Sequence, residues 1–496
     1  MASIQKPAPA PLSGAAPNVG SITFGLVGFL FLLELVSGIL QGYYIPLIPT
    51  IIKHLGIETA SYNWFEAAQL LLSAIVVPFL AKLGDMYGHK RILLISTVLT
   101  ALSSWGLAFS GNFTTYLIAF ALQGFYVVWL PLEVALIFDK GRRSGRSASQ
   151  TRRAAGFLVV ALELGAIIGD LAGGNLIDVF HNNVPLTLMI PAIAVTLVFF
   201  AILFGVPESE PLPGRSLDAG GFVLLTIGLL LITGGLAFLR IEGPGALWVY
   251  AMMLAGVLVF VPWTLFELKR PDPAIDIRVF RQPNMWPVQV TAGLVGISLL
   301  GAQAPLATFA GADPRSGAGP GLSSGGISVV VGIYLISLIV GAVLFPILSN
   351  RLSPRIALII ATFFVAAGYL DFLLLHTTEI ETLANMIVAG LGSGALVGAL
   401  PSTAAAAAPR GQTGIATGLT NTTKTIGGSF ASSTFAIVLA GSAVQFLGHS
   451  TPSLGGYLTV FTICGCGALV AALLLFLVPK LAFADDAVES LQEPAR

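Results

Sequence analysis

The feature that most constrains the fold is a succession of long apolar runs, each about as long as a helix that crosses a membrane. Such a helix needs about 20 mostly apolar residues, and the chain contains fourteen runs of that kind. Only 10% of the residues are charged, whereas soluble proteins carry about 25%, so a soluble fold is excluded. We therefore predict an all-α membrane protein whose helices cover residues 23–45, 64–80, 92–109, 114–137, 155–177, 185–206, 220–239, 248–265, 286–309, 327–348, 356–375, 383–404, 415–439 and 457–478.

A polar, basic turn at residues 81–91 sets the predicted sidedness. It lies between the second and third apolar runs, and a turn of this composition cannot lie in hydrocarbon because its polar groups would have no partners. Lys and Arg favour the cytoplasmic side of a membrane. With the turn and both termini in the cytoplasm, all but three of the 24 lysines and arginines lie on that side; the exceptions are Lys53, Arg240 and Arg315.

A short internal repeat indicates two related halves. Residues 83–92, after the second run, resemble residues 348–356, after the tenth run. The two positions are equivalent if six spans, an inserted pair and six further spans follow one another, an arrangement typical of transporters with a central path. We expect a disordered cytoplasmic tail, an N-terminal six-helix bundle, an inserted helix pair, a C-terminal six-helix bundle and a second cytoplasmic tail, at residues 1–20, 21–207, 208–268, 269–480 and 481–496.

Composition also argues against several functions. The net charge is zero, so nothing favours nucleic acid as a partner. The chain has no Gly-x-x-x-x-Gly-Lys-Ser/Thr loop for ATP phosphates, and its two cysteines, Cys464 and Cys466, face different sides of one apolar run. We therefore expect no enzyme activity, no metal and no cofactor. An ion gradient or the solute's own gradient has to supply the energy.

Several short patches then carry a family resemblance across nearly the whole chain. The turn Leu83-Gly84-Asp85-x-x-Gly88-His89-Lys90-Arg91, the glycines of the fifth run, and Asp218-x-x-Gly221 each match in order and spacing. So do Pro273-x-x-Asp276-x-Arg278 and Gly418-Leu419-x-Asn421-Thr422-x-Lys424-x-x-Gly427-Gly428. The chain resembles the major facilitator superfamily, in its fourteen-span drug:proton antiporter branch.

The resemblance implies roles for some residues, whereas other functional residues of the family are missing from this sequence. It implies that Asp85, Gly88 and Arg91 form a latch that holds one conformation. It also identifies Gly165, Gly169, Gly173 and Gly174 with the antiporter motif, and their spacing independently predicts close helix packing. Three positions depart from the family pattern: Phe120 replaces an arginine, Asp170 a proline and Leu40 an acid. The standard proton-coupling residues are therefore not carried over.

Acidic residues within the predicted spans are the candidates for function. An ionised carboxyl group in lipid costs about 2.5–3.5 kcal/mol, so such residues face a wet path or a partner. Apart from Lys424, no cation lies within a span to neutralise them, and an unpaired acid that can become neutral suits a proton carrier. We predict that proton-coupling or solute-binding residues are among Glu34, Gln41, Glu133, Glu163, Asp170 and Asp371.

Each candidate also has a structural interpretation. Glu163 and Asp170 are seven residues apart and share a helix face, where they either line a cavity or bind a neighbouring helix. Glu66 and Glu133 lie near the ends of their spans, from which they could extend to the membrane surface. Asp371 stands alone in the second half. The aromatic residues near these acids favour neutral or cationic amphiphiles as solutes.

The resulting functional prediction is a secondary transporter, driven by a proton gradient, that exports hydrophobic or amphipathic compounds by alternating access. We expect a monomer in the lipid bilayer of the cytoplasmic (plasma) membrane. Two alternatives stay open: a facilitator or importer on the same scaffold, and a membrane sensor that does not transport. The number of protons moved per solute distinguishes a facilitator or importer from a proton-driven exporter. Ligand binding without flux would identify a sensor.

Overall fold

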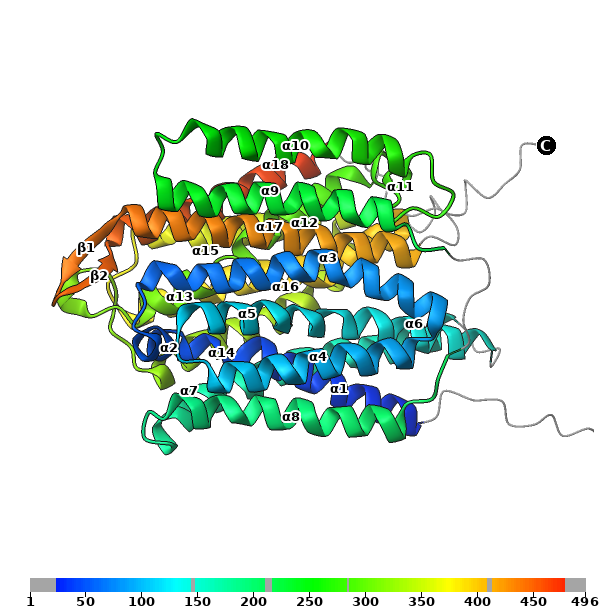
Figure 1. Ribbon diagram of the computed structural model, residues 1–496, viewed down its shortest axis with the longest axis horizontal. Helices are drawn as coiled ribbons and strands as arrows, with labels where there is room; N and C mark the ends of the chain where they lie inside the picture. The colour runs from blue at the N-terminus through cyan, green and yellow to red at the C-terminus, as the bar shows by residue number, and fades with distance from the viewer. Residues whose placement is uncertain (1–23, 144–147, 210–215, 283–284, 408–412, 478–496) are drawn as a thin grey trace, which may run out of the picture.

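A computed structural model describes residues 24–143, 148–209, 216–282, 285–407 and 413–477, so both predicted tails lie outside the described residues. Nearly all described residues are helical, and the long helices run side by side along one direction (Figure 1). The first half of the chain contains α1 (Phe24–Tyr43), α2 (Ile48–Leu55), α3 (Asn63–Tyr87), α4 (His89–Phe109), α5 (Phe113–Gln123), α6 (Trp129–Arg143), α7 (Ala148–Val179) and α8 (Val184–Gly205).

The inserted pair and the second half follow. They contain α9 (Ala219–Glu242), α10 (Leu247–Glu267), α11 (Ile277–Phe280), α12 (Trp286–Leu299), α13 (Gln303–Ala310), α14 (Ser324–Arg351), α15 (Pro354–Leu370), α16 (Glu379–Ala407), α17 (Thr413–Gly441) and α18 (Leu454–Leu475). Two short strands, β1 (Ala443–Phe446) and β2 (His449–Pro452), stand between the last two helices.

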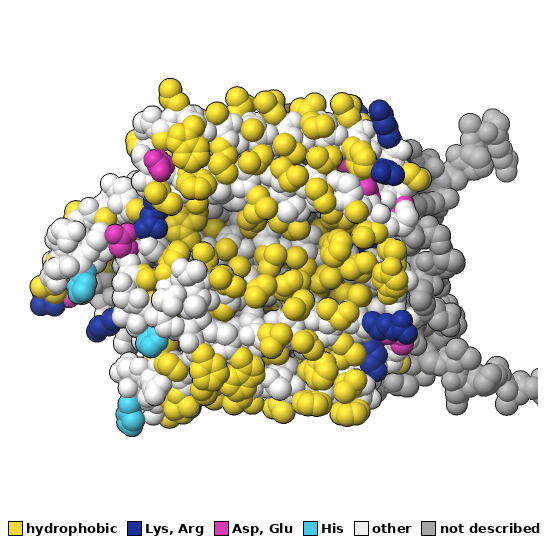
Figure 2. Space-filling view, viewed as in Figure 1, with side chains coloured by type: hydrophobic (Ala, Val, Ile, Leu, Met, Phe, Trp, Pro, Cys, Tyr) yellow, Lys and Arg dark blue, Asp and Glu magenta, His cyan; other side chains and the backbone are white. Residues whose placement is uncertain are grey.

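The membrane-spanning character is confirmed, with thirteen spans of sufficient length and hydropathy among the described residues. The remaining predicted span corresponds to α17, a 29-residue helix that runs beside the others (Figure 1). Hydrophobic side chains cover the long flank of the molecule, and charged side chains gather at its two ends, as Figure 2 shows. This distribution is what a protein surrounded by lipid tails requires.

Several predicted runs are not single helices. The first run ends in η1 (Ile45–Leu47) before α2, the fourth is broken by η3 (Gly124–Val128), and the ninth is divided into α12 and α13. The prediction of an all-α chain also missed the β1–β2 hairpin, whose two-residue turn places Leu447 and Gly448 at positive φ. Positive φ at both turn residues is typical of tight hairpins.

The two halves repeat the same helix pairs. In the first half α1 packs on α7 and α4 on α8; in the second half α12 packs on α17 and α15 on α18. Contacts between the halves follow the same symmetry, because α3 packs on α17 and α14 on α7. The helix packing thus agrees with the repeat predicted from the two polar turns.

The glycine motif of α7 packs as predicted. A Cβ atom added to Gly165, Gly169 or Gly173 would collide with backbone oxygens of α1, which itself contributes Gly38 and Gly42 to the contact. Position 174 instead faces α14, so the motif also contacts the second half. Small residues allow this backbone-to-backbone approach, which anchors α7 against α1.

Candidate functional site

A cavity lies between the two halves, near the middle of the bundle. Its walls come from α1, η1, α2, η2 (Thr59–Tyr62), α3, α5, η3, α13 and α17, and from Leu300 just after α12. Its volume, about 80 Å³, is well below the roughly 300–1,000 Å³ of pockets that hold drug-sized ligands. The cavity is therefore contracted in this conformation, and a larger solute requires the halves to separate around it.

Polar side chains from both halves line this cavity. Gln41, Glu66 and Gln69 come from the first half, and Asn421 and Lys424 come from α17 in the second. The prediction placed Gln41 on a functional face, and the structure brings it to the cavity wall. Glu66 is buried and lies 3.5 Å from the Ser432 hydroxyl, so the interpretation that it extends to the membrane surface is wrong.

An aromatic cluster forms one wall. Phe120, which stands where the family has an arginine, lies with its ring centre 5.8 Å from that of Tyr44 and 6.0 Å from that of Tyr62. The Tyr44 hydroxyl accepts a hydrogen bond of 2.8 Å from the Gln123 side chain, which fixes the ring against the cavity. Tyr126 also lines the cavity, whereas the Trp129 side chain, outside the wall, is fully buried.

Glu163 and Lys424 are oppositely charged residues of different halves that influence each other without a direct ion pair between them. Glu163 lies on α7 and Lys424 on α17, and their charges interact although the residues are far apart in sequence. The cavity wall includes Lys424 but not Glu163. Glu163 therefore acts on the cavity through Lys424, and its side chain does not itself form part of the wall.

Glu34 and Glu133 form a second, purely acidic pair. Glu34 on α1 and Glu133 on α6 are 1% and 0% exposed, and the two carboxyl groups interact electrostatically. Both oxygens of Glu133 lack a hydrogen-bond partner among the described residues. Glu133 thus does not extend to the membrane surface. Tyr126 lines the cavity and is close enough to Glu34 for an electrostatic interaction, so the acid pair lies near the cavity wall.

The two remaining candidates lie elsewhere. Asp170 is fully buried where α7 meets α14, with its carboxyl group facing Gly332 and outside the cavity wall. Asp371 begins η5 (Asp371–Leu373), the short turn that ends the eleventh span, and its backbone oxygen accepts hydrogen bonds from Leu374 and Leu375. Asp371 therefore lies at the end of its span, apart from the cavity wall.

The predicted latch is held by residues that sequence reasoning did not select. The amide nitrogens of Lys90 and His89 donate to Glu208 Oε1 (3.0 Å) and Ser209 Oγ (2.8 Å). The Arg91 side chain forms an ion pair with Glu208 at 3.6 Å. The Asp85 carboxylate lies 3.4 Å from the imidazole of His89. The turn is thus bound to the segment after α8, which anchors it within the first half.

Gly88 at this turn leads to a first prediction. Its φ is +105°, and an added Cβ atom would lie 2.5 Å from Glu208 Oε1. The Gly88→Ala variant should therefore lose about 1–3 kcal/mol of stability, which a melting temperature in detergent measures. Gly111→Ala is the control, because nothing lies within 4 Å of that site. Equal melting temperatures of the two variants would contradict the assigned contact.

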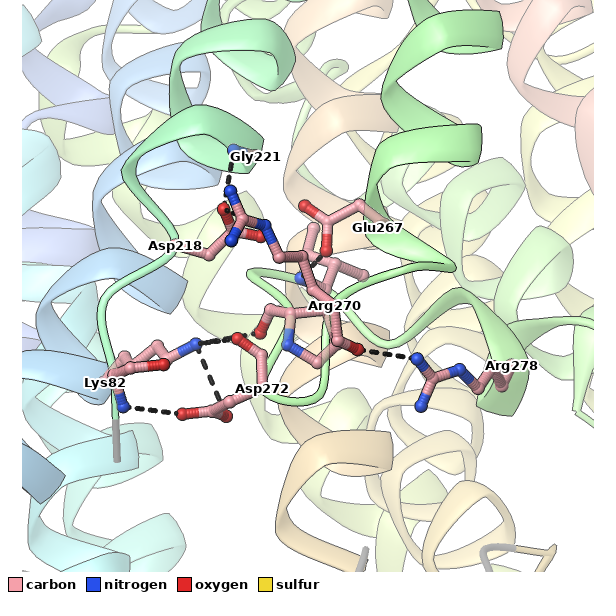
Figure 3. A network of polar contacts seen from close by, with 10 residues as sticks. Lys82, Asp218, Gly221, Glu267, Arg270, Asp272 and Arg278 are labelled. Atoms are coloured by element: carbon pink, nitrogen blue, oxygen red, sulfur yellow. Dashed lines mark hydrogen bonds and ion pairs between the residues drawn. The ribbon is translucent and has the colours of Figure 1, made fainter. Parts of the chain in front are cut away.

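A polar network joins the first half to the segment that precedes the second (Figure 3). The Lys82 ammonium group near the end of α3 donates to the Asp272 and Pro273 carbonyl oxygens, at 2.8 and 3.0 Å, and lies 3.4 Å from the Asp272 carboxylate. Asp218 caps the start of α9 and lies 3.8 Å from Arg270, just after α10. The start of α9 and the end of α10, which form the inserted pair, are therefore both attached to this polar network.

A second prediction concerns Lys82. It is 8% exposed, so Lys82→Met leaves two partly buried carbonyl oxygens without this donor and removes the ion pair with Asp272. We expect the free energy of unfolding to fall by about 1–3 kcal/mol, together with faster proteolysis of the 268–276 loop. Lys269→Met removes an exposed lysine from the same loop and should change neither measurement. Identical proteolysis of both variants would argue against the network.

Known proteins with related sequences include two named export proteins and a multidrug transporter. The chain is 24% identical over 405 residues to the tetracenomycin C resistance and export protein of Streptomyces glaucescens, covering 79% of this chain and 71% of that protein. It is 27% identical over 395 residues to the cephamycin export protein CmcT of Amycolatopsis lactamdurans (77% and 78% covered). The third is the multidrug transporter protein MdtP of Bacillus subtilis, 24% identical over 401 residues (77% and 69% covered).

Solved structures share the fold. The nucleoside transporter NupG superposes with a TM-score of 0.61 at 12% identity, covering 92% of this chain and 98% of that chain. A bacterial homolog of the human lysosomal transporter Spinster gives 0.63 at 14% identity (96% and 100% covered). The family model for the Major Facilitator Superfamily matches residues 30–432. Together with the paired halves and the cavity between them, this match shows that the chain belongs to the Major Facilitator Superfamily.

Proposed function

We propose that this protein exports hydrophobic or amphipathic small molecules by alternating access, driven by a proton gradient. The observation that carries the proposal is the cavity between two repeated halves, lined by polar and aromatic groups and lying near a buried acid pair. The names of the related proteins, which include antibiotic export proteins and a multidrug transporter, support export and this class of solute.

The hydrogen bonds between membrane-spanning helices of the two halves support a cytoplasm-facing conformation, since at the opposite end Lys82 binds, among the described residues, only the connecting segment before α11. Hydrogen bonds join Thr50 to Ser324, Ser328 to the Asp170 carbonyl and Ser429 to the Ala67 carbonyl. These contacts lie towards the end of the bundle that carries the β-hairpin, which the charge distribution assigns to the outside. A solute would then enter from the cytoplasm, and breaking these contacts would open the outer side.

The same distribution of charge supports a proposal for location and sidedness, and the monomeric state stays a prediction. We propose a multi-pass protein of the cytoplasmic membrane with both termini in the cytoplasm, acting as a monomer. The aromatic cavity wall and Glu66 favour neutral or cationic amphiphiles, in line with the sequence-based prediction, but Lys424 in the same wall adds a site of opposite charge. The cavity can therefore hold solutes of more than one charge.

The test is solute flux with purified protein in liposomes. A proton gradient should drive an amphipathic solute, either the cationic dye ethidium or neutral anthraquinone-2-carboxamide, into the acidic compartment, and a protonophore should abolish the accumulation. Solutes that only equilibrate would indicate a facilitator. Binding without flux would indicate a sensor, and either result would contradict the proposal.

A further inference from the structure

Lys424 is a cation held in the middle of a membrane protein. It lies on α17, it is half-buried, and it is the only Lys or Arg in the described wall of the cavity. An ammonium group has three N–H donors. Within the part of the chain that the structure describes, no hydrogen bond to its side chain is present. The cavity therefore contains the N–H donors of an ammonium group that have no acceptor among the described residues.

The nearby acids differ in what else they contact. Glu66, in the same wall, lies next to the Ser432 hydroxyl and accepts a hydrogen bond from the backbone at Ala304. Glu163 interacts with Lys424, and among the described residues it has no hydrogen bond of its own. Glu163 thus lowers the positive potential at Lys424 from outside the cavity wall, without forming a direct ion pair with it.

The position of this pair does not suit a purely structural ion pair. Glu163 belongs to the first half and Lys424 to the second, and the two halves must move relative to each other during alternating access. A buried ion pair adds little stability compared with apolar packing. The two charges lie on bodies that move and are not in direct contact, so the cation of Lys424 is available to a solute in the cavity.

Other groups in the cavity can bind oxygen atoms of a solute. The side-chain amides of Gln41, Gln69 and Asn421 line the same space and make no side-chain hydrogen bonds among the described residues. An apolar wall beside them is supplied by aromatic rings, namely Phe120, Tyr44 and Tyr62. A planar, partly aromatic molecule with carbonyl or hydroxyl groups fits this combination.

From this arrangement we infer that Lys424 binds an acidic group of the solute, a carboxylate or an ionised phenol, and that the negative charge of Glu163 opposes the binding of that group. The inference rests on the proposed transport function and specifies its solute class. Because Glu163 and the acidic group of the solute carry the same charge near one ammonium group, Glu163 weakens solute binding and assists release.

The test uses two ligands that differ only in charge, anthraquinone-2-carboxylate and anthraquinone-2-carboxamide. Calorimetry on the purified protein in nanodiscs gives dissociation constants, and liposomes give flux. We expect wild-type protein to prefer the carboxylate by at least about tenfold. Lys424→Met should reduce this preference to about twofold or less, and Lys424→Arg should keep it. Lys53→Met, at an exposed site of α2, is the matched control and should match wild type.

Glu163→Gln gives an independent test if Lys424→Met does not fold. Removing the negative charge of Glu163 should strengthen the binding of anthraquinone-2-carboxylate by about threefold or more and lower the maximal flux of that ligand. Binding of the carboxamide should be unchanged. Weaker carboxylate binding by Glu163→Gln, or an unchanged preference in folded Lys424→Met, would overturn the inference. Wild-type export of the carboxamide with no preference for the carboxylate would overturn it and leave export intact. Preferential carboxylate binding without any flux would support it and contradict the transport function.

Discussion

The Gly165→Val variant is expected to lose the folded bundle. A Cβ atom at residue 165 would overlap the Leu35 carbonyl oxygen and approach Gly38 Cα at 3.0 Å, so α1 and α7 would have to separate along their whole contact. Forcing atoms into a packed contact costs about 1–3 kcal/mol. Here both colliding groups are backbone and cannot rotate away, so we expect at least about 3 kcal/mol. Thermal unfolding in detergent and the yield of monodisperse protein measure the effect.

Gly28→Val is the matched control for that substitution. Gly28 lies on α1, the other helix of the same pair, and nothing is within 4 Å of the position of its missing Cβ atom. The control should fold with a yield close to that of the wild type. If Gly165→Val were as stable as Gly28→Val, the close contact between α1 and α7 would be refuted.

The Glu34→Gln, Glu133→Gln double variant is expected to fold but to lose proton-driven accumulation. Replacing two buried acids by amides removes no ion pair with a cation among the described residues, so stability should be unchanged or higher. A gradient of about one pH unit supports about tenfold accumulation for one proton exchanged per neutral solute. Wild-type liposomes should approach that ratio, and those with the double variant should show no accumulation.

Glu379→Gln supplies the control for the acid pair. Glu379 is exposed at the start of α16, so its variant should accumulate solute like the wild type. Accumulation by the double variant at the wild-type ratio would remove Glu34 and Glu133 from the coupling mechanism. If the double variant does lose accumulation, the two single variants show whether Glu34, Glu133 or either one alone is sufficient for coupling.

The features that depend on local composition were predictable from the sequence. Long apolar runs determined the helices, and the spacing of Gly165, Gly169 and Gly173 predicted their close packing, since both follow from period and residue size. The positive φ of Gly88 could also be predicted, because the tight turn between two spans needs a residue that tolerates positive φ.

Contacts between distant helices were not predictable in the same way. Nothing in the local sequence of Glu133 indicates that it meets Glu34, because the rotation of α6 about its axis is set by packing after the break at η3. The same holds for the electrostatic interaction between Glu163 and Lys424, which arises only when the two halves assemble. The segment after α8 likewise has no pattern that marks it as the partner of the polar turn between α3 and α4.

Proton movement measured together with solute movement tests the central claim most directly. Purified protein is placed in liposomes that contain a pH-sensitive dye such as pyranine, and a solute that carries no ionisable group, such as anthraquinone-2-carboxamide, is supplied down its concentration gradient. Coupled exchange predicts that solute entry drives protons out, so the lumen becomes alkaline, and that the Glu34→Gln, Glu133→Gln variant shows no such change. Solute entry with a constant luminal pH in the wild type would contradict the account.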